Sequence, residues 1–355
     1  MIVIDGSYGE GGGQILRTSI ALSSLLKIPI KIYNIRKKRK NPGLKPQHFT
    51  AVKALKEITS ANVKGLEIGS TELIFEPKFI EGGKYIFDIK TAGSIPLFFQ
   101  CTILPLLFAS KIVEIYIKGG TDVKNSPTID YLRFVIIPYL RKFAEINLEI
   151  KRRGFYPRGG GIVYLRIKPL LKRDKYESSE KFLEEVRKRF KRLNLIERAD
   201  LREIYIYACA SEDLSNRKVC EREIKVAEKI LKEKYDCNII STFFYDKTLS
   251  TGNSITIVGI RENGIIFGAD AIGEKKKRAE DVAREVSQKF IKYEENGAID
   301  NHLADNLIPY LSLVGGMINT DSFTSHLLTN IWVSERFFGK IFFIDEKSRI
   351  IKTNF

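Results

Sequence analysis

The 355-residue chain is poor in histidine, cysteine, methionine and tryptophan, with three, four, two and one of each. The cysteines Cys101, Cys209, Cys220 and Cys237 form no CxxC pair, and their spacing does not suggest a zinc site. We therefore expect free thiols in a cytoplasmic protein. The alternative is a disulfide among the last three cysteines, which a hyperthermophilic source would favour.

Long apolar runs are also missing. No stretch reaches 18 uncharged apolar residues, and the opening MIVIDG has no basic segment of the kind that starts a signal peptide. We therefore expect a protein that is neither secreted nor membrane-spanning, and that has no membrane partner.

Positive charge is present in excess. The 59 lysines and arginines outnumber the 43 acidic residues, which gives a formal net charge of +16 at pH 7. Such an excess favours polyanionic partners such as RNA, DNA or nucleotides. Charge alone leaves open the alternative of a protein that is simply basic.

Strand-like and helix-like runs alternate along the chain. Residues 27–36 and 112–120 have strand patterns, 48–59 has a helical pattern, and 96–109 is an almost wholly apolar helix. This alternation predicts an α+β fold with helices against one face of each sheet. Pairs or triplets of glycine recur from residue 11 to residue 316, which favours a repeated β-α unit, although the units share little sequence.

The character of the chain changes near residue 171. The following charge-dense stretch places Phe182, Val186, Phe190 and Leu193 on one helical face. A second amphipathic helix and several strand-like runs follow. We expect residues 172–276 to form a smaller inserted α/β domain of order β-α-β-α-β-β, and residues 1–171 plus 277–355 to form the large domain.

One histidine, His326, lies in the run DSFTSHLLTNIWVSERFF. Ser322, Thr324 and Ser325 are candidate N-caps, which places His326 in or just before a first helical turn. The helix dipole there favours anions and disfavours imidazolium. A neutral imidazole beside a bound phosphate is what attack on phosphorus requires. The alternative is a polar residue near a helix start with no special role.

Another histidine, His302, shares a helical face with Asp305 and Asn306 in HLADN. A flat ring beside a carboxylate suits a nucleotide base and ribose. Spacing alone slightly favours the alternative, a solvent-exposed helix face. Two ligands without a third make metal binding by His302 and Asp305 a weak hypothesis.

The densest basic stretch is RKKRK, residues 36–40, which leads through a Pro-Gly turn to a helix starting near Gln47 and His48. Arginine forks suit phosphate oxygens. A solvated charge run is the alternative, and the helix start that follows makes the two interpretations about equal.

The opening GSYGEGGGQILR is glycine-rich but lacks both common phosphate-loop patterns. No lysine follows Gly11–Gly13 as a Walker A loop requires, and Gln14 stands where GxGxxG needs its third glycine. The loop carries Glu10 and, at the helix entrance, Arg17. A carboxylate beside a triphosphate usually shares a divalent cation with it, so Mg²⁺ or Mn²⁺ would suit Glu10.

Seven motifs occur in the order found in RNA 3′-terminal phosphate cyclases: GSYGEGGGQILR, RKNPGLKPQH, AGSIPLFFQ, GGTD, RGFYPRGGG, HLADN and SHLLTN. The chain resembles an archaeal-type member of this family from residue 2 to about residue 345, and residues 172–276 are the most diverged part. The run RGFYPRGGGIV, residues 153–163, is the most specific signature.

The resemblance implies a large domain of three repeated α/β units, similar to the C-terminal domain of a translation initiation factor, with a smaller inserted domain. It also implies an ATP-dependent ligase that converts an RNA 3′-phosphate to a 2′,3′-cyclic phosphate. A histidine takes AMP from ATP and releases diphosphate, and the AMP then passes to the RNA 3′-phosphate. Finally the 2′-hydroxyl closes the ring and expels AMP.

The resemblance also assigns residues. It makes His326 the nucleophile, His302 the ring that stacks on adenine, Pro127 the opposite wall and Glu10 the metal ligand. Further nucleotide contacts would come from Gln100, Leu303, Ala304, Asp305 and Asn306. Contacts to phosphates and the RNA end would come from Arg17, Arg36, Arg39, Gln47 and His48. Asn306 departs from the family pattern, where glutamine is common.

Three other functions are weighed against this one. A non-catalytic RNA-binding relative acting in ribosomal RNA processing would lack the nucleophilic histidine, which this chain keeps. An ATP-independent ribonuclease would use two histidines as acid and base. An enolpyruvyl transferase has a similar fold, but the seven motifs argue against it.

Overall fold

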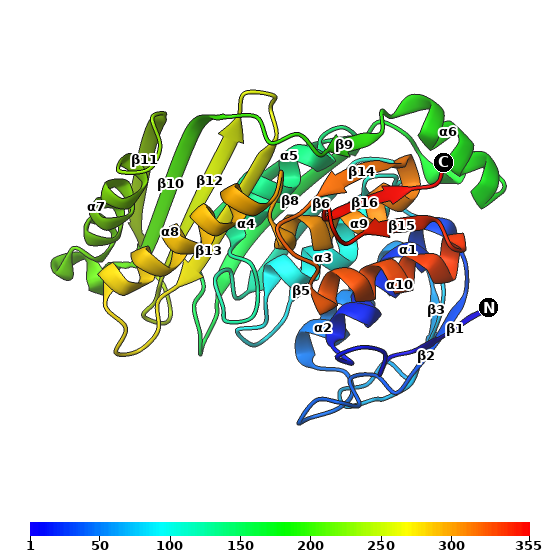
Figure 1. Cartoon of the computed structure of the whole chain (residues 1–355). Coiled ribbons are helices and arrows are strands. Elements are labelled where there is room, and N and C mark those ends of the chain that lie inside the picture. Colours follow the sequence, from blue (N-terminus) through cyan, green and yellow to red (C-terminus); the bar gives the residue numbers. More distant parts are fainter.

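A computed structural model of residues 1–355 contains four four-stranded sheets and ten α-helices (Figure 1). Three of the sheets are built alike. The first unit consists of β1 (Ile2–Asp5), α1 (Gly13–Leu26), β2 (Ile30–Tyr33), α2 (Pro46–Ile58), β3 (Asn62–Lys64) and β4 (Leu73–Glu76). Its strand order is β1-β2-β4-β3, and only the β1–β2 pair is parallel.

The second unit repeats this plan, with strand order β5-β6-β8-β7 and a parallel β5–β6 pair. A five-residue π-helical segment, Leu132–Ile136, joins its two short helices α4 and α5. Its elements are β5 (Gly83–Asp88), α3 (Ile95–Leu106), β6 (Val113–Gly119), α4 (Ile129–Tyr131), α5 (Ile137–Leu140), β7 (Ala144–Arg152) and β8 (Gly161–Pro169).

The third unit has the order β9-β14-β16-β15 with a parallel β9–β14 pair, which is the same plan again. Helix α6 (Ser179–Arg189) precedes this unit in the sequence. The elements of the third unit are β9 (Leu193–Leu195), α9 (Asn301–Val314), β14 (Gly316–Asn319), α10 (Ser325–Phe338), β15 (Phe342–Asp345) and β16 (Ile350–Thr353). The expected three repeated units are therefore confirmed, each with the succession β-α-β-α-β-β.

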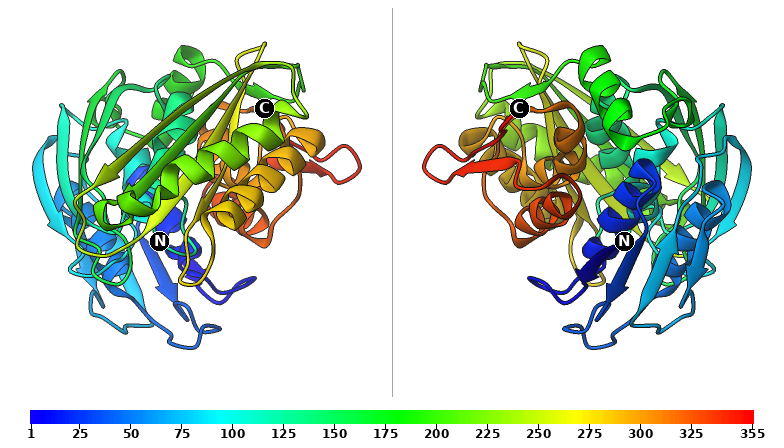
Figure 2. Two further views of the ribbon diagram at one scale, coloured as in Figure 1. Left: turned by 90° about the vertical axis from the view of Figure 1, so that its left-hand side faces the viewer. Right: turned by 90° about the vertical axis from the view of Figure 1, so that its right-hand side faces the viewer.

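A separate sheet interrupts the third unit between β9 and α9. Its strand order is β11-β10-β12-β13, and α7 and α8 lie side by side over one of its faces (Figure 2). These elements bury a hydrophobic cluster of their own. They are β10 (Leu201–Ser211), α7 (Val219–Lys232), β11 (Asn238–Asp246), β12 (Asn253–Arg261), β13 (Ile266–Ile272) and α8 (Ala279–Asn296).

We expected residues 172–276 to form the inserted domain, but the packing places both of its boundaries elsewhere. Phe182, Val186 and Phe190 of the α6 region are buried in the core of the large body, and β9 pairs with β14. Helix α8, which we expected to return to the large domain, covers the inserted sheet instead. An amphipathic pattern shows that a face is buried but not what buries it. We propose residues 201–296 as the inserted unit, with the order β-α-β-β-β-α.

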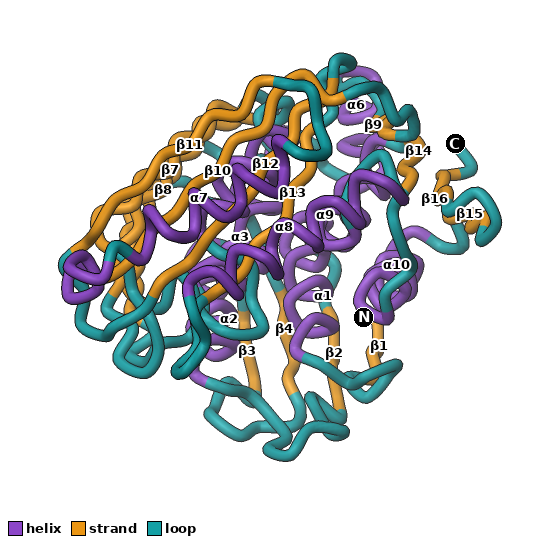
Figure 3. Tube along the Cα trace, turned by 60° about the vertical axis from the view of Figure 1, so that its left-hand side comes forward, coloured by secondary structure: helices purple, strands orange, loops and turns teal.

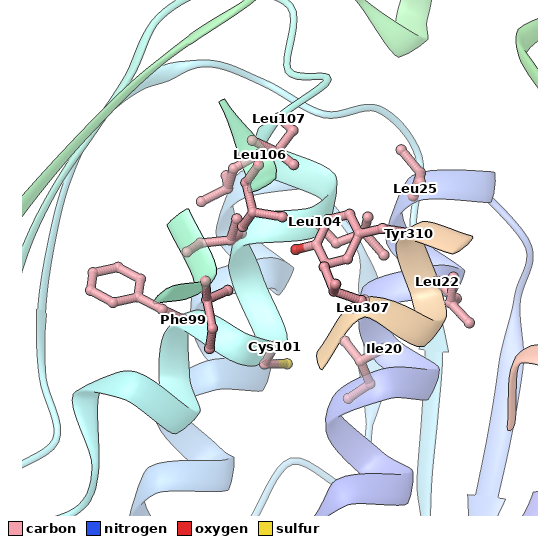
Figure 4. Close-up of a cluster of buried hydrophobic side chains, with 14 of the residues drawn as sticks. Ile20, Leu22, Leu25, Phe99, Cys101, Leu104, Leu106, Leu107, Leu307 and Tyr310 are labelled. Atoms are coloured by element: carbon pink, nitrogen blue, oxygen red, sulfur yellow. The ribbon is translucent and has the colours of Figure 1, made fainter. Parts of the chain in front are cut away.

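The helices of the large body group together, with the strands of its sheets around them (Figure 3). Leucine and isoleucine side chains of α1 and α3 meet Leu307 and Tyr310 of α9 there (Figure 4). Helix α1 also packs against α10. This contact brings the beginnings of α1 and α10, from the first and third units, close to each other. No helix has both the length and the apolar character needed to cross a membrane.

Candidate active site

At the end of the glycine-rich loop, where α1 begins, one position has room only for glycine because the ring of His48 lies against it. A Cβ atom on Gly13, the first residue of α1, would lie 2.2 Å from Nε2 of His48. His48 is 4% exposed, so its ring has little room to move. The glycine therefore lets the start of α1 touch the histidine that follows the basic stretch in the sequence.

The carboxylate of Glu10 connects three segments that are distant in the sequence. Its Oε1 atom accepts a hydrogen bond from Ser325 Oγ at 2.5 Å, and its Oε2 atom lies 3.1 Å from Arg39 Nη2 and 3.8 Å from His326 Nε2. The Ser325 hydrogen bond, with His326 and Arg39 nearby, lowers the pKa of Glu10. Glu10 is thus a fixed anion that faces the predicted nucleophile.

The side chain of His326 lies in the first turn of α10, as we expected. Thr324 is the N-cap, and its hydroxyl accepts a hydrogen bond from the backbone N–H of Leu327 at 2.9 Å. Gln14 of α1 donates to the His326 carbonyl oxygen at 2.6 Å, which ties the two helix starts together. Partial burial lowers the pKa of His326, and nearby Arg17 adds to this, while Glu10 opposes it. The imidazole is consequently neutral at neutral pH.

The residues predicted to bind phosphates are close enough to influence one another. Burial, with Arg17 and Arg36 nearby, lowers the pKa of His48 to about 3. Burial lowers the pKa of Arg17 to about 10, which leaves its guanidinium charged at neutral pH. Cations beside the N-terminus of a helix form an environment that suits phosphate groups. Arg36 also ties its own loop by donating to the carbonyl oxygens of Asn41 and Gly43.

A short chain of hydrogen bonds links Gln47 to the loop that carries Pro127. Gln47 Oε1 accepts from the backbone N–H of Ser94 at 3.1 Å, and Ser94 Oγ lies 2.5 Å from Ser126 Oγ. Ser126 in turn donates to the carbonyl oxygen of Pro127. A residue predicted to bind the RNA end is therefore connected to a predicted wall of the adenine slot.

A second series of hydrogen bonds connects Arg17 to Gln100 and Asn306, which are predicted to contact the nucleotide. Arg17 Nε donates to Gln100 Oε1 at 3.0 Å, and Gln100 Nε2 donates to Asn306 Oδ1 at 2.9 Å. Asn306, which stands where glutamine is common, donates back to the His302 carbonyl oxygen. The polar face of α9 is thus fixed to α1 and α3, and the shorter amide still reaches Gln100.

The carboxyl group of Asp305 lies beside the start of α10. Its Oδ1 atom accepts a hydrogen bond from Thr324 Oγ1 at 2.9 Å. Asp305 is 6% exposed, and burial, with Asp300 and Asp321 nearby, raises its pKa to about 8. A predicted nucleotide contact is therefore coupled directly to the N-cap of the helix that carries His326.

The ring of His302 is exposed and lies edge-on to two tyrosines, 6.3 Å from Tyr131 and 6.5 Å from Tyr293 between ring centroids. Pro127 lies just before α4, the helix that contains Tyr131. Tyr131 therefore connects the segments of both expected walls of the adenine slot. An exposed ring supported from the side is free to stack on a base with its face.

Leu303 and Ala304 are the least accessible of the residues expected to contact the nucleotide. Both are 0% exposed and belong to the hydrophobic core of the large body. Their side chains pack in this core and hold α9 in place, so the expected contact would have to come from their backbone atoms. They lie on the buried face of the helix, whereas His302 and Asn306 lie on the accessible one.

Several residues of the site were not predicted from the sequence. Ser325 and Gln14 contact Glu10 and His326, and Asn330 joins Thr18 Oγ1 to the Asp305 carbonyl oxygen. Gln14 and Ser325 belong to the motifs GSYGEGGGQILR and SHLLTN, but their partners lie more than 300 residues away in the sequence. Only the packing of α1 against α10 reveals them.

The donor set around Glu10 decides which kind of metal site fits. No group of three or more histidine, cysteine, aspartate or glutamate side chains is arranged to hold a metal. Glu10 is the one carboxylate of its loop, and its side chain is 46% exposed. This does not fit a cation held by the protein alone, but it does fit a hard cation shared between one carboxylate and a ligand's phosphates.

Comparison with known proteins extends over nearly the whole chain. The family model of RNA 3′-terminal phosphate cyclase matches residues 8–344. Curated proteins named RNA 3′-terminal phosphate cyclase are similar: that of Staphylothermus marinus is 43% identical over 360 residues, covering 99% of this chain and 94% of the relative. Those of Ignicoccus hospitalis and Pyrococcus furiosus are each 41% identical, covering 96% of this chain and 94% of the relative. With a match of this extent, the chain belongs to the RNA 3′-terminal phosphate cyclase family.

Proposed function

We propose that this protein uses ATP to convert an RNA 3′-terminal phosphate into a 2′,3′-cyclic phosphodiester, releasing AMP and diphosphate. The names of its relatives support the overall reaction. The observation that carries the mechanism is the position of His326, whose Nε2 atom lies 3.8 Å from Glu10 Oε2 at the start of α10.

In the first step, a neutral ring nitrogen of His326 attacks the α-phosphorus of ATP. A nitrogen–phosphorus bond forms, the bond from the α-phosphorus to the bridging oxygen breaks, and diphosphate leaves. The lowered pKa of His326 keeps the nitrogen lone pair available. Arg17, Arg39 and the N-terminus of α10 stabilise the negative charge on the phosphates. A divalent cation at Glu10, Mg²⁺ or Mn²⁺, would add positive charge to the same phosphates.

In the second step, an oxygen of the RNA 3′-phosphate attacks the phosphorus of the AMP group, and the bond to His326 breaks. In the third, the 2′-oxygen attacks the 3′-phosphorus, loses its proton to solvent and expels AMP. Gln47 and His48 would hold the RNA phosphate, and the ribose already holds the 2′-hydroxyl within reach. That proximity supplies much of the rate for ring closure.

The nucleotide would lie along the accessible face of α9. His302 and Pro127 form the two sides of an adenine slot, and Gln100, Asp305 and Asn306 supply polar contacts to the base or ribose. Because Asp305 accepts a hydrogen bond from Thr324, the N-cap of α10, nucleotide binding would also steady His326.

The decisive experiment is a two-stage labelling. The protein is incubated with α-labelled ATP and Mg²⁺ or Mn²⁺, separated from free nucleotide, and then given RNA with a 3′-phosphate. We expect label on the protein that leaves as AMP, and an RNA end that resists phosphatase. RNA with a 3′-hydroxyl is the control and should not form a cyclic end. Formation of cyclic ends by protein that carries no AMP and has not been incubated with ATP would contradict the proposal.

A further inference from the structure

The signature loop RGFYPRGGG, residues 153–161, has no role in the reaction proposed above. Its first residue, Arg153, is 1% exposed, and its guanidinium lies 3.1 Å from Asp122 and 2.6 Å from Asp130. Its backbone N–H donates to Asp246 of β11 at 2.6 Å. Buried charges are tolerated only when they are well paired. The loop is therefore anchored to the large body and to the inserted unit together.

The other end of the loop is fixed as well. Gly159 has a φ of +63°, and its N–H donates to the Phe155 carbonyl oxygen at 2.8 Å. A Cβ atom at Gly159 would lie 2.8 Å from the Cα atom of Ala92. Phe155 is 3% exposed. With both ends held and its phenylalanine buried, the loop is a rigid turn.

This rigid turn projects Tyr156 into solvent. Tyr156 is 74% exposed and forms no side-chain hydrogen bond, and Arg158 only reaches the Leu249 carbonyl oxygen at 3.4 Å. Lys90 and Lys247, on segments that flank the turn, are also exposed. An aromatic ring among arginine and lysine side chains is how proteins hold single-stranded RNA, by stacking on a base and pairing with phosphates.

The turn is next to the segment that supports the RNA-end residue Gln47. The residue whose Cα atom Gly159 touches, Ala92, is two positions before Ser94, and the backbone N–H of Ser94 donates to Gln47 Oε1. The turn and Gln47 therefore contact the same short segment, residues 92–94, which connects the position of Tyr156 to that of Gln47.

We propose that Tyr156 stacks on a base upstream of the 3′-terminal nucleotide of single-stranded RNA, while Arg158, Lys90 and Lys247 bind the adjoining phosphates. The placement of the RNA end at Gln47 rests on the proposed function, but the contribution of Tyr156 to RNA affinity does not depend on any chemical step. The inserted unit, through Asp246 and Leu249, then serves to support this platform.

The test is equilibrium binding of a ten-nucleotide single-stranded RNA with a 3′-phosphate, measured by fluorescence anisotropy without ATP. We expect Tyr156→Ala to weaken binding about tenfold and Tyr156→Trp to retain it, because stacking needs only an aromatic face. The matched control is Phe343→Ala, which removes another exposed ring, on β15, and should leave affinity unchanged. In a plot of the logarithm of RNA affinity against the logarithm of salt concentration, Arg158→Ala should make the slope less steep by about 0.7.

Two further measurements separate this inference from the proposed function. Tyr156→Ala should leave labelling by α-labelled ATP unchanged, and also cyclisation of a nucleoside 3′-monophosphate, which has no upstream base. Unchanged affinity of Tyr156→Ala for the ten-nucleotide RNA would overturn the inference, even if cyclisation occurs. If the wild type forms no cyclic ends but its RNA affinity still depends on Tyr156, the proposed function fails and the inference stands.

Discussion

The Nε2 atom of His326 lies 3.8 Å from the Oε2 atom of Glu10, although the two residues belong to the third and first repeated units. The packing of α1 against α10 brings them together, and Ser325 and Gln14 fix the contact from both sides. A carboxylate beside a predicted nucleophile has two opposed effects. It raises the pKa of the imidazole, and in the proposed function it would hold a cation that neutralises phosphate charge.

The first prediction concerns His326 as the nucleophile. His326→Ala should abolish covalent labelling by α-labelled ATP, because no other side chain at the start of α10 is a comparable nucleophile. The matched control is His302→Ala, which removes the exposed ring of α9. It should require more ATP for half-maximal labelling but reach a similar final level. The measurement is label on denatured protein after gel separation, and labelling of His326→Ala would show that another residue attacks.

The second prediction concerns the pH dependence of His326. Burial lowers its pKa below the usual 6.5 while Glu10 raises it, so removing the carboxylate should lower it further. We expect the His326 ring protons of Glu10→Gln to titrate at lower pH than those of the wild type, as measured by NMR without nucleotide. Since only the neutral ring attacks, wild-type labelling should rise with pH through this pKa and level off above about pH 6.5.

Glu10→Ala extends the same prediction to catalysis. It should depress His326 labelling at every pH while the thermal unfolding temperature stays near that of the wild type, because the Glu10 side chain is 46% exposed. A titration of His326 in Glu10→Gln at higher pH than in the wild type would contradict the electrostatic account. Unchanged labelling in Glu10→Ala would make the loop structural.

Much of the fold follows from local patterns, but the partners of each element do not. The alternation of strand-like and helix-like runs located β2, α2, α3 and β6, because periodicity and burial are local properties. The succession β-α-β-α-β-β belongs to the three large units, whereas we assigned it to the insertion. The amphipathic face of α6 was recognised, but α6 packs in the large body and not in the insertion as expected. Helix α8 was assigned to the large domain, but it packs on the inserted sheet.

The candidate site divides in the same way. Glu10, His326 and His48 were singled out from their motifs, and the family resemblance assigned their roles, which stay predictions. Leu303 was included because it lies in the HLADN motif, although helical periodicity places it on the buried face. Ser325 was considered only as a cap, since its contact with Glu10 depends on a tertiary packing that no local pattern encodes.

The third prediction concerns Asp305. Its pKa in the folded protein is raised from a usual 3.8 to about 8, mainly by burial. The folded state therefore binds a proton more tightly than the unfolded state, so this residue favours folding at low pH and loses that effect as pH rises toward 8. The side chain introduced in the Asp305→Asn variant stays neutral at every pH. The free energy of unfolding of this variant should therefore exceed that of the wild type by an amount that grows between pH 4 and pH 8.

Urea unfolding at pH 5 and pH 8 measures this margin. The control is Asp88→Asn, at a surface ion pair with Lys118, where exposed charges contribute little. A margin for Asp305→Asn that shrinks with rising pH would contradict the assignment. The same variant should bind ATP more weakly if Asp305 contacts the nucleotide.

The fourth prediction concerns the close approach of Gly13 to His48. Alanine at a helix position is normally tolerated or mildly stabilising, by up to about 1 kcal/mol relative to glycine. Here its Cβ atom would lie 2.2 Å from His48 Nε2, and His48 is nearly fully buried. We expect Gly13→Ala to destabilise the protein by about 1–3 kcal/mol through overpacking. It should also reduce His326 labelling, because Arg17, one turn further along α1, would have to shift.

A double-mutant cycle tests whether His48 causes this loss. His48→Ala removes the ring that the new Cβ atom would meet, so the double variant should be less destabilised than the sum of the two single variants, by about 0.5–3 kcal/mol. Chemical denaturation of the four proteins gives the coupling energy. Additive effects would mean that the glycine is needed for another reason. A non-additive result would establish that the glycine-rich loop acts by admitting a buried, neutral imidazole beside the start of α1.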